Sequence, residues 1–193
     1  LANAKEMPGI WNREFKATGR IVDSAFLKSV DHIAFTMTYE EMLSATLLYR
    51  SVFGMLSTTP TVIADQGGLV KSQVMQTSDQ AVCFALNSSQ AEGTLSNRVM
   101  RQYAGTGVQH IAFSCSDIFA LASAMSKAGV ATMPVPENYY DDIAARFQLS
   151  PEMIERMKIF GILYDEDEHG SFFQLYTKHF HRRFAFEIVE RRG

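Results

Sequence analysis

Two histidines of this chain lie in nearly identical short stretches that are far apart in the sequence. His32 occurs in VDHIAF and His110 in VQHIAF, so that 110 − 32 = 78 residues separate them. A carboxylate, Glu187, lies in a third apolar stretch, FAFEIVER, near the end of the chain. Two imidazoles and one carboxylate form the ligand set of non-haem Fe(II) oxygenases, which leaves open positions for substrate and oxygen. A divalent metal site is therefore the chemistry that these three residues suggest.

Side chains alternate across a strand, and this alternation places each histidine on a face with small residues. His32 shares its face with Ala34, and His110 shares its face with Ala112, while the bulky residues lie opposite. Small residues on one face of a strand and bulky residues on the other are typical of a sheet that borders a cavity on one side and a hydrophobic core on the other. Glu187 also lies in an apolar strand pattern, where burying an acid without a partner is costly.

Structural roles for these residues are the alternative to a metal site. A single histidine in a strand is more often a hydrogen-bonded core residue, and a glutamate near a chain end is usually solvated. Two histidines at equivalent positions of a repeat, with an acid in the expected last strand, favour a common role. From the pattern alone, the metal site and the structural interpretation stay about equally open.

The segments around these residues repeat the same order of predicted elements. A strand at 30–38 precedes a helix over 39–55, and strand-like runs follow up to residue 87. The order recurs from residue 107, with a strand, a helix over 117–130, a short strand at 131–136, a largely helical insertion over 137–161, and strands in ILYD, SFFQLYTK and FAFEIVER. Each unit has the order β-α-β-β-β.

This repeat predicts an α+β fold in which two βαβββ modules, about 27–95 and 106–193, form a half-open barrel. Each module alone would leave one sheet face bare, so the pair is the folding unit. Residues 1–26 lack a clear period and are interpreted as a linker or N-terminal arm. The metal-binding domain is then expected to span residues 27–193.

The composition narrows the class of protein. Hydrophobic residues make up 47% and charged residues 20% of the 193 residues, as in globular proteins. The formal net charge of −3 argues against a nucleic-acid partner, and no apolar run reaches the roughly 20 residues that span a bilayer. Cys83 and Cys115 are expected to be buried, reduced thiols, which fits a cytoplasmic location.

Several stretches, in order along about residues 26–193, resemble 4-hydroxyphenylpyruvate dioxygenase. They are VDHIAF, FALNSS, GVQHIAF, PENYYDDIAAR, GILYDEDEHGSFFQLYTK and FEIVERRG. The resemblance implies the vicinal-oxygen-chelate fold, also called the glyoxalase, bleomycin resistance and dihydroxybiphenyl dioxygenase fold. It also implies an Fe(II) site, which another divalent metal can occupy, with the ligands His32, His110 and Glu187.

The same resemblance implies partners and a pocket. The partners are dioxygen and a small aromatic or 2-oxo acid that chelates the metal. The positions that match the family's substrate pocket are Ser72, Asn87, Gln109 and Gln174. A turn or strand-end hydrogen bond is an equally good interpretation for Ser72 and Asn87.

The chain departs from that family at three positions that bear on the substrate. Asn97 stands where the family usually has Gln, Tyr176 where it has Phe, and Ala185 where it has Phe. Loss of an aromatic wall weakens binding of an aryl ring, and a new hydroxyl favours a more polar ligand. A substrate other than 4-hydroxyphenylpyruvate itself is therefore expected.

Parts of the chain also resemble the C-terminal domain of bacterial fusion proteins in which a 3-dehydroshikimate dehydratase barrel precedes a 4-hydroxyphenylpyruvate-dioxygenase-like domain. Three functions stay open at this point. The first is an Fe(II) dioxygenase that acts on a 2-oxo acid, and the second is a metal-binding companion domain of a bifunctional dehydratase in quinate and shikimate catabolism. The third is an extradiol-type dioxygenase that acts on a catechol. A homo-oligomer is expected.

The remaining polar candidates have simpler interpretations. His169 lies in the acidic stretch DEDEHG, which is typical of a solvated turn. The stretch KHFHRR predicts a hairpin tip of exposed cations, formed by His179, His181, Arg182 and Arg183. Tyr139 and Tyr140 at the start of the insertion are expected to pack rather than to cap the cavity.

Overall fold

The computed structural model describes residue 9 and residues 13–16, 26–65, 67–168 and 170–193. Module 1 consists of β1 (Leu27–Thr36), α2 (Tyr39–Phe53), β2 (Leu56–Ser57), β3 (Thr61–Asp65), β4 (Gly68–Gln76), β5 (Cys83–Ser88) and α3 (Leu95–Tyr103). Module 2 consists of β6 (Gly107–Cys115), α4 (Ile118–Lys127), α5 (Glu137–Arg146), α6 (Pro151–Phe160), β7 (Leu163–Asp167), β8 (Gly170–Tyr176) and β9 (Ala185–Arg192). Most of the expected arm, residues 1–26, lies outside the described ranges.

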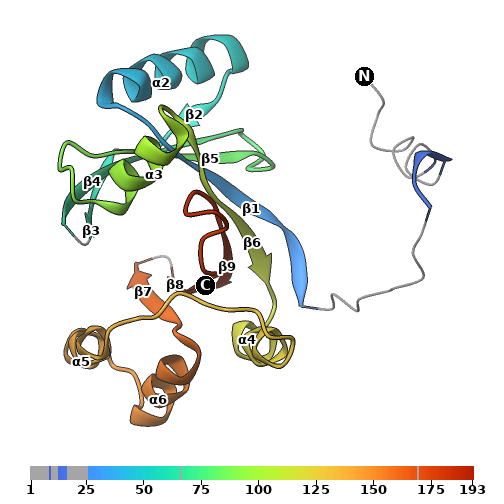
Figure 1. Cartoon of the computed structure of the whole chain (residues 1–193), viewed down its shortest axis with the longest axis vertical. Coiled ribbons are helices and arrows are strands. Elements are labelled where there is room, and N and C mark those ends of the chain that lie inside the picture. Colours follow the sequence, from blue (N-terminus) through green and yellow to red (C-terminus); the bar gives the residue numbers. More distant parts are fainter. Residues whose placement is uncertain (1–8, 10–12, 17–25, 66, 169) are drawn as a thin grey trace.

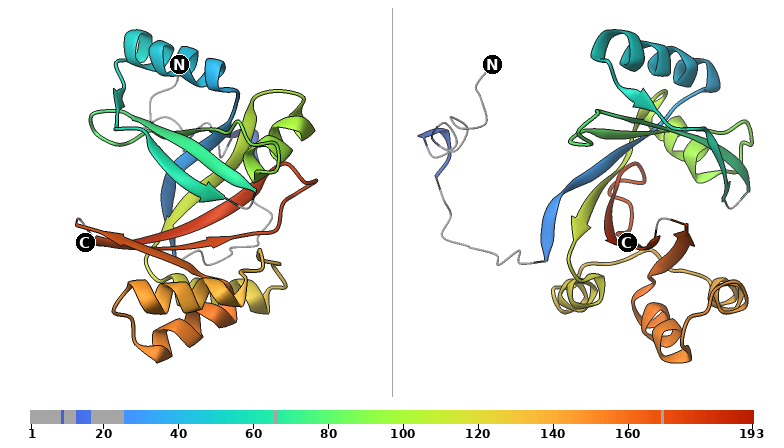
Figure 2. Two further views of the ribbon diagram at one scale, coloured as in Figure 1. Left: turned by 90° about the vertical axis from the view of Figure 1, so that its left-hand side faces the viewer. Right: turned by 180° about the vertical axis from the view of Figure 1, so that it is seen from behind.

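One nine-stranded sheet runs through both modules in the order β2-β4-β5-β1-β6-β9-β8-β7, with β3 paired to β4. The central strands β1 and β6 are antiparallel, with Ile33 opposite Ile111. Each is flanked by a parallel strand of its own module, β5 beside β1 and β9 beside β6. The sheet curls between α2 at one end and α4, α5 and α6 at the other (Figures 1 and 2). The predicted α+β fold of two paired modules is confirmed.

The helices begin and end at residues whose side chains suit those positions. Thr38 accepts a hydrogen bond from the Glu41 backbone N–H, and Glu41 accepts one from the Thr38 N–H, which forms a capping box before α2. Gly54 ends α2 at a φ of 65°, a left-handed conformation that favours glycine. Asp117 caps α4 by accepting a hydrogen bond from the Ala120 N–H.

Two hydrophobic cores lie under the helices, one in each module. The larger core packs α4, α5 and α6 onto the strands of module 2, and its fully buried members include Ile118, Met157, Ile162 and Leu175. The smaller core, under α2, consists of Met37, Met42, Met55, Met75 and Leu86. Four of these five residues are methionines, whose flexible side chains fill irregular gaps well.

Helix α2 carries an apolar stripe that is mostly exposed. Its members recur at helical spacing and are Met42, Leu43, Ala45, Leu47 and Leu48. Only Met42 is buried, and Leu47 is 67% exposed. The equivalent helix of module 2, α4, is covered by α5 and α6, into which the insertion folds. Among the described residues of module 1, no such pair of helices covers α2. The pattern therefore predicted the helix but not how much of its apolar surface is covered.

The prediction of a strand at 131–136 was wrong. Only Thr132 forms an isolated bridge there. Pro134 and Pro136 have no backbone N–H, so the segment cannot continue a ladder of hydrogen bonds. A helix that no prediction covered, α3, follows the first module's strands and is capped by Thr94.

Most of the smaller expectations about packing agree with the structure. Cys115 is a buried free thiol, as expected, but Cys83, also a free thiol, is only half-buried. Tyr140 is buried in the larger core and its hydroxyl donates to the Met157 carbonyl oxygen, while Tyr139 packs against the same core. None of the described helices combines the length and the apolarity needed to cross a membrane.

Candidate metal centre

The antiparallel pairing of β1 with β6 brings His32 and His110 together. His32 lies opposite Ala112, and His110 lies opposite Ala34. The alanines leave room for the imidazoles, whose ring centroids are 5.4 Å apart and whose Nε2 atoms are 3.3 Å apart. The small residues that follow the histidines in sequence are thus the residues that make space for them.

The carboxylate of Glu187 completes a group of three. Strand β9 pairs in parallel with β6, and Glu187 lies opposite Ala112. Its Oε2 atom is 3.0 Å from His110 Nε2 and 3.3 Å from His32 Nε2, and the ligand atoms of the three residues lie within 4.8 Å of one another. Neighbouring ligands at right angles around a metal, with bonds of about 2.1 Å, lie about 3.0 Å apart. The spacing therefore fits one face of a coordination shell.

Glu187 has a symmetry-related counterpart in module 1 that is not an acid. In module 2, β6 and β9 pair Ala112 with Glu187, and in module 1, β1 and β5 pair Ala34 with Ala85. The two strands are related about the Ile33–Ile111 pair, so Ala34 in β1 corresponds to Ala112 in β6. The strand partner of Ala34, Ala85, therefore corresponds to the strand partner of Ala112, Glu187. The fold therefore offers four inward positions near the centre, and this chain places ligand side chains at three of them.

Burial and charge oppose each other at this centre. Glu187 is 1% exposed. Burial disfavours its charged form, but hydrogen bonds from His110 and His32 outweigh burial and lower the pKa of Glu187 to about 2. Burial also disfavours the charged imidazole of His32, but its hydrogen bonds to Asp31 and Glu187 raise the pKa of His32 to about 9. The carboxylate thus attracts a positive charge, which an imidazole proton or a metal ion can supply.

The other oxygen of this carboxylate, Glu187 Oε1, is buried without a hydrogen-bond partner among the described residues. Leaving a buried acceptor unpaired costs on the order of 1–3 kcal/mol, and more for a charged group. A cation beside the carboxylate removes that cost. The donor set and the unpaired oxygen therefore fit a divalent metal that accepts imidazole and carboxylate ligands.

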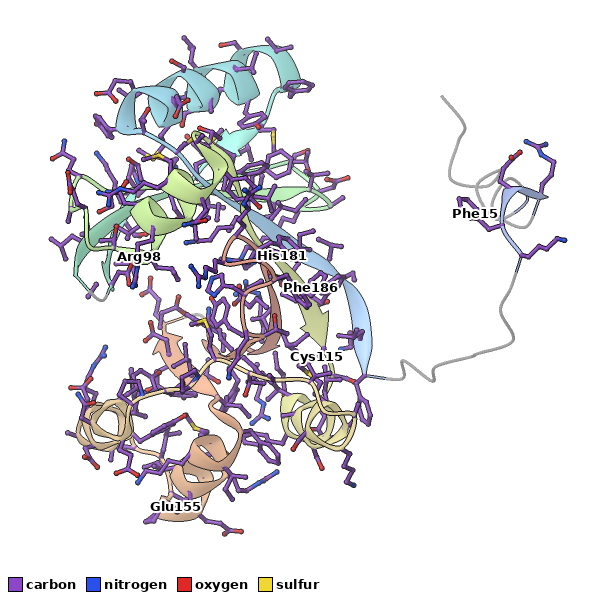
Figure 3. All side chains as sticks on the ribbon, in the orientation of Figure 1. Phe15, Arg98, Cys115, Glu155, His181 and Phe186 are labelled. Atoms are coloured by element: carbon purple, nitrogen blue, oxygen red, sulfur yellow. The ribbon has the colours of Figure 1, made fainter. Side chains whose placement is uncertain are left out.

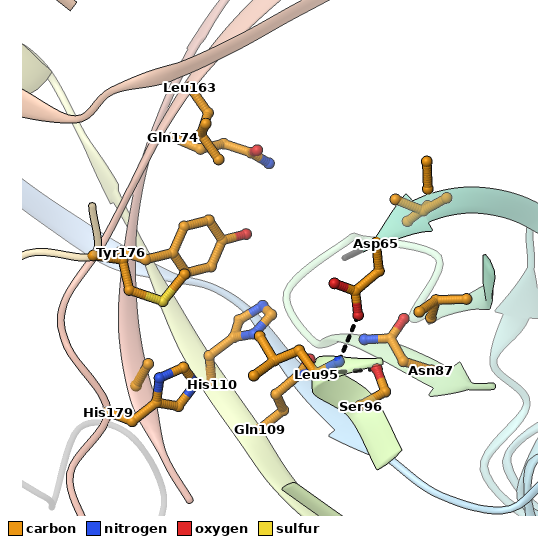
Figure 4. A pocket seen from close by; sticks show the side chains of 15 residues that line it. Asp65, Asn87, Leu95, Ser96, Gln109, His110, Leu163, Gln174, Tyr176 and His179 are labelled. Atoms are coloured by element: carbon orange, nitrogen blue, oxygen red, sulfur yellow. Dashed lines mark hydrogen bonds between the residues drawn. The ribbon is translucent and has the colours of Figure 1, made fainter. Parts of the chain in front are cut away.

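A cavity of about 320 Å³ opens beside this centre, between the two modules. His110 lines it, as Figure 4 shows. Three of the four residues predicted for a substrate pocket also line it, namely Asn87, Gln109 and Gln174. The fourth, Ser72, is buried opposite Asn87 in the β4–β5 pairing and is not part of the lining. Module 1 and module 2 both contribute walls, so the cavity depends on their pairing.

Gln109 reaches the cavity because β6 contains a bulge. Its pairing with β1 passes from His110 directly to Val108, so that Gln109 is an extra, unpaired residue. A bulge interrupts the alternation of side chains. Simple alternation would place Gln109 and His110 on opposite faces, but the Gln109 amide nitrogen lies 3.5 Å from the Ser96 hydroxyl in a buried position.

Tyr176 and Ala185, which depart from the dioxygenase pattern, both line the cavity. The Tyr176 ring stands edge-on to His110 with centroids 5.4 Å apart. Burial, and then the neighbouring Glu187 carboxylate, raise the pKa of Tyr176 well above its ordinary value, so its hydroxyl stays protonated. Asn97 is not part of this lining, and its amide donates to the carbonyl oxygens of Ser89 and Ala91.

The prediction that His179 lies at an exposed hairpin tip was wrong. His179 is half-buried and lines the cavity, because the loop between β8 and β9 folds back over it. His181 and Arg182 in the same loop are exposed, as predicted, and both adopt positive φ values of 50° and 62°. His169 lies outside the described residues.

A groove of about 870 Å³ shares part of its lining with the cavity and carries three arginines, Arg98, Arg101 and Arg182. Figure 3 shows Arg98 below α3, on the side that faces the helices of module 2. Arg101 pairs with Glu92 at 2.9 Å, whereas Arg98 and Arg182 form no ion pair within the described residues. The acid of the shared lining, Asp65, accepts a hydrogen bond from a backbone N–H at the start of α3. Arg98 and Arg182 together carry one more charge than Asp65, so the groove has a net positive charge.

A family model described as the Glyoxalase/Bleomycin resistance protein/Dioxygenase superfamily matches residues 29–174, and the chain belongs to this superfamily. The resemblance to the vicinal-oxygen-chelate fold is thereby confirmed. In structure, the chain is similar to a variant of 4-hydroxymandelate synthase from Streptomyces coelicolor, with a TM-score of 0.78 and 24% identity over 92% of this chain and 51% of that chain. At that identity the likeness concerns the fold alone.

Nearer relatives in sequence point to two kinds of enzyme. The chain is 37% identical to a 3-dehydroshikimate dehydratase of Pseudomonas aeruginosa over 95% of this chain and 29% of the relative. It is 29% identical to a 4-hydroxyphenylpyruvate dioxygenase of Coccidioides posadasii over 91% of this chain and 47% of the relative. A solved fusion of a xylose isomerase-like TIM barrel and 4-hydroxyphenylpyruvate dioxygenase matches 87% of this chain and 26% of its own, with 33% identity and a TM-score of 0.71. The chain thus spans less than half of these proteins.

Proposed function

We propose that the chain is a non-haem Fe(II)-dependent dioxygenase domain of the 4-hydroxyphenylpyruvate dioxygenase type, acting on a 2-oxo acid or a related aromatic chelating substrate. The observation that carries this proposal is the group of His32, His110 and the buried Glu187 beside a ligand-sized cavity. Fe(II) held by these residues would supply open positions at which a chelating acid and dioxygen meet. The dioxygenase relatives support the same assignment.

The cavity walls would hold the substrate in one orientation. Gln174 from module 2 and Asn87 from module 1 carry amides that both donate and accept hydrogen bonds, which suits keto and carboxylate oxygens. Tyr176 adds a hydroxyl donor next to His110. Apolar side chains such as Val70 and Leu163 line the rest and keep water from the reacting groups.

The cationic approach favours an acid as the substrate. Arg98 and Arg182 line the groove that adjoins the cavity and have no carboxylate partners within the described residues. Positive charge at the mouth of a cleft concentrates anionic ligands and speeds their association. A 2-oxo acid carries the negative charge that such a mouth attracts.

The test is anaerobic reconstitution with Fe(II), followed by oxygen uptake after addition of 4-hydroxyphenylpyruvate or, separately, protocatechuate. The proposal predicts uptake with a 2-oxo acid, release of carbon dioxide, and loss of both in His110→Ala. Uptake with protocatechuate alone would replace the proposal by a ring-cleaving dioxygenase. Iron binding without uptake for any aryl 2-oxo acid would refute the dioxygenase assignment.

A second candidate is a metal-binding companion domain of a bifunctional 3-dehydroshikimate dehydratase. The observation that favours it is the 37% identity to such a dehydratase over nearly the whole chain. It predicts stoichiometric metal binding, no oxygen uptake, and no protocatechuate when 3-dehydroshikimate is added to this chain. Protocatechuate formed by this chain would contradict the companion role, because the dehydration would then occur here.

A further inference from the structure

A second bulge in the central strand pair places Asp31 beside a candidate ligand. The pairing of β1 with β6 passes from Val30 to His32, so that Asp31 is an extra, unpaired residue. Without the bulge, Asp31 and His32 would point to opposite faces of the sheet. With it, Asp31 Oδ1 accepts a hydrogen bond from His32 Nδ1 at 2.8 Å.

Asp31 is itself held from the last strand of the sheet. Arg191 in β9 donates from Nε to Asp31 Oδ2 at 3.1 Å and from Nη2 to Asp31 Oδ1 at 2.8 Å. This is a two-point contact between planar groups, which fixes direction as well as distance. The Arg191 guanidinium also lies 5.8 Å from the centroid of the Phe172 ring. The carboxylate of Asp31 therefore has little freedom to turn away from His32.

The corresponding position in module 2 carries a different residue. The two repeats read VDHIAF and VQHIAF, and each has its bulge at the residue before the histidine. Gln109 directs its amide to Ser96, and no hydrogen bond joins Gln109 to His110. Among the described residues, a carboxylate therefore supports His32 from behind, and none does so for His110.

We propose that Asp31, oriented by Arg191, is a positioning residue that presents His32 Nε2 to the metal and makes His32 the firmer of the two imidazole ligands. A carboxylate that accepts from Nδ1 fixes the tautomer in which Nε2 has the free lone pair, and it fixes the plane of the ring. The His32 Nε2 atom then points at Glu187 Oε2 and His110 Nε2, both 3.3 Å away. The inference rests on the metal site of the proposed function.

The experiment is a titration of the metal-free protein with Co(II), which reports the dissociation constant and the visible d–d absorption of the bound ion. Asp31→Asn should weaken Co(II) binding 10- to 100-fold and alter the absorption band, as loss of an outer-shell partner typically does. Arg191→Gln should weaken binding several-fold. Arg192→Gln is the matched control, because Arg192 is the next residue of β9 and pairs with Glu190 instead, at 2.6 Å. It should bind Co(II) within twofold of the wild type.

Thermal unfolding of each metal-free variant separates positioning from a general loss of fold. Arg191 has a side chain that is 58% exposed, so Arg191→Gln is expected to fold even where Asp31→Asn does not. Wild-type Co(II) affinity and absorption in Arg191→Gln, or in a folded Asp31→Asn, would overturn the proposal. Failure of the wild type itself to bind Co(II) would instead refute the metal site, so the two failures are distinguishable.

Discussion

The stability of the metal-free protein should fall as the pH rises from 6.5 to 8.5. The cause is His32, whose pKa rises from 6.5 to about 9 because its hydrogen bonds to Asp31 and Glu187 outweigh the effect of burial. A group whose pKa is raised by folding stabilises the folded state fully below its unfolded pKa, and this contribution is lost as the pH rises through the folded pKa. Linkage across this interval gives a loss of about 2 kcal/mol in the free energy of unfolding.

At acidic pH the stability of the metal-free protein should change in the opposite direction and rise with pH. The pKa of Glu187 is lowered from 4.5 to about 2, so its contribution is present above pH 4.5 and is lost as the pH falls through about 2. Together the two groups place the stability maximum of the metal-free protein between about pH 4.5 and 6.5. In the metal-loaded protein His32 binds as a neutral imidazole, so the decline above pH 6.5 should be absent.

The assay is thermal unfolding by circular dichroism in the presence of a chelator at pH 6.5, 7.5 and 8.5. For a chain of this length, about 2 kcal/mol corresponds to roughly 4–8 °C in Tm. Cys83 and Cys115 have raised pKa values owing to burial, and their unfolded thiols begin to titrate only near the upper limit of this range. The control is His32→Gln, which retains the other titrating groups. A Tm that stays level in the wild type, or that falls equally in His32→Gln, would refute the reasoning.

Three further predictions concern the core, the mouth and the wall of the cavity. Leu175→Ala, in the fully buried core, should cost about 2–5 kcal/mol in urea unfolding, whereas Leu47→Ala on the exposed stripe of α2 should change stability by no more than about 0.5 kcal/mol. Replacing both Arg98 and Arg182 by Gln should raise the KM for an acidic substrate several-fold at low salt, and an unchanged KM would exclude a steering role. Ala185→Phe should add an aromatic contact of about 0.5–1.5 kcal/mol and lower the KM for an aryl 2-oxo acid by roughly 2- to 10-fold. A higher KM would show that the substrate needs the space beside Ala185 in the cavity.

The candidate ligands could be predicted from sequence because four simple rules act on them together. The V-x-H-I-A-F repeat places His32 and His110 at equivalent positions, and alternation puts both on one face. The repeated element order predicts two modules that form one half-open barrel, and the histidine strand is the first strand of each module. Glu187 follows, because an acid in an apolar strand needs a partner.

The side-chain positions of the residues around these ligands, Asp31, Gln109 and His179, could not be predicted from the strand pattern. A bulge adds one residue to a strand, and a period-two pattern does not reveal where pairing skips it. The positions of Asp31 and Gln109 therefore depend on the register between β1 and β6, which is a tertiary property. The same limit applies to His179, because its place on the cavity wall depends on how the β8–β9 loop folds back. Helix α3 was missed although Leu95, Val99 and Tyr103 recur at helical spacing, because it is only 9 residues long and most of its other residues are polar.

Position 85, an alanine in this chain, is a place where the duplicated fold could add a ligand to the metal centre without a change in the backbone. Because Ala85 is the counterpart of Glu187, a carboxylate introduced there by Ala85→Glu would approach the same centre from the other module. A fourth protein ligand would leave fewer exchangeable positions, which suits polarisation of a bound substrate more than chemistry that must admit both substrate and oxygen. A change at this single strand position would thus alter how many positions of the proposed centre stay open to substrate and oxygen.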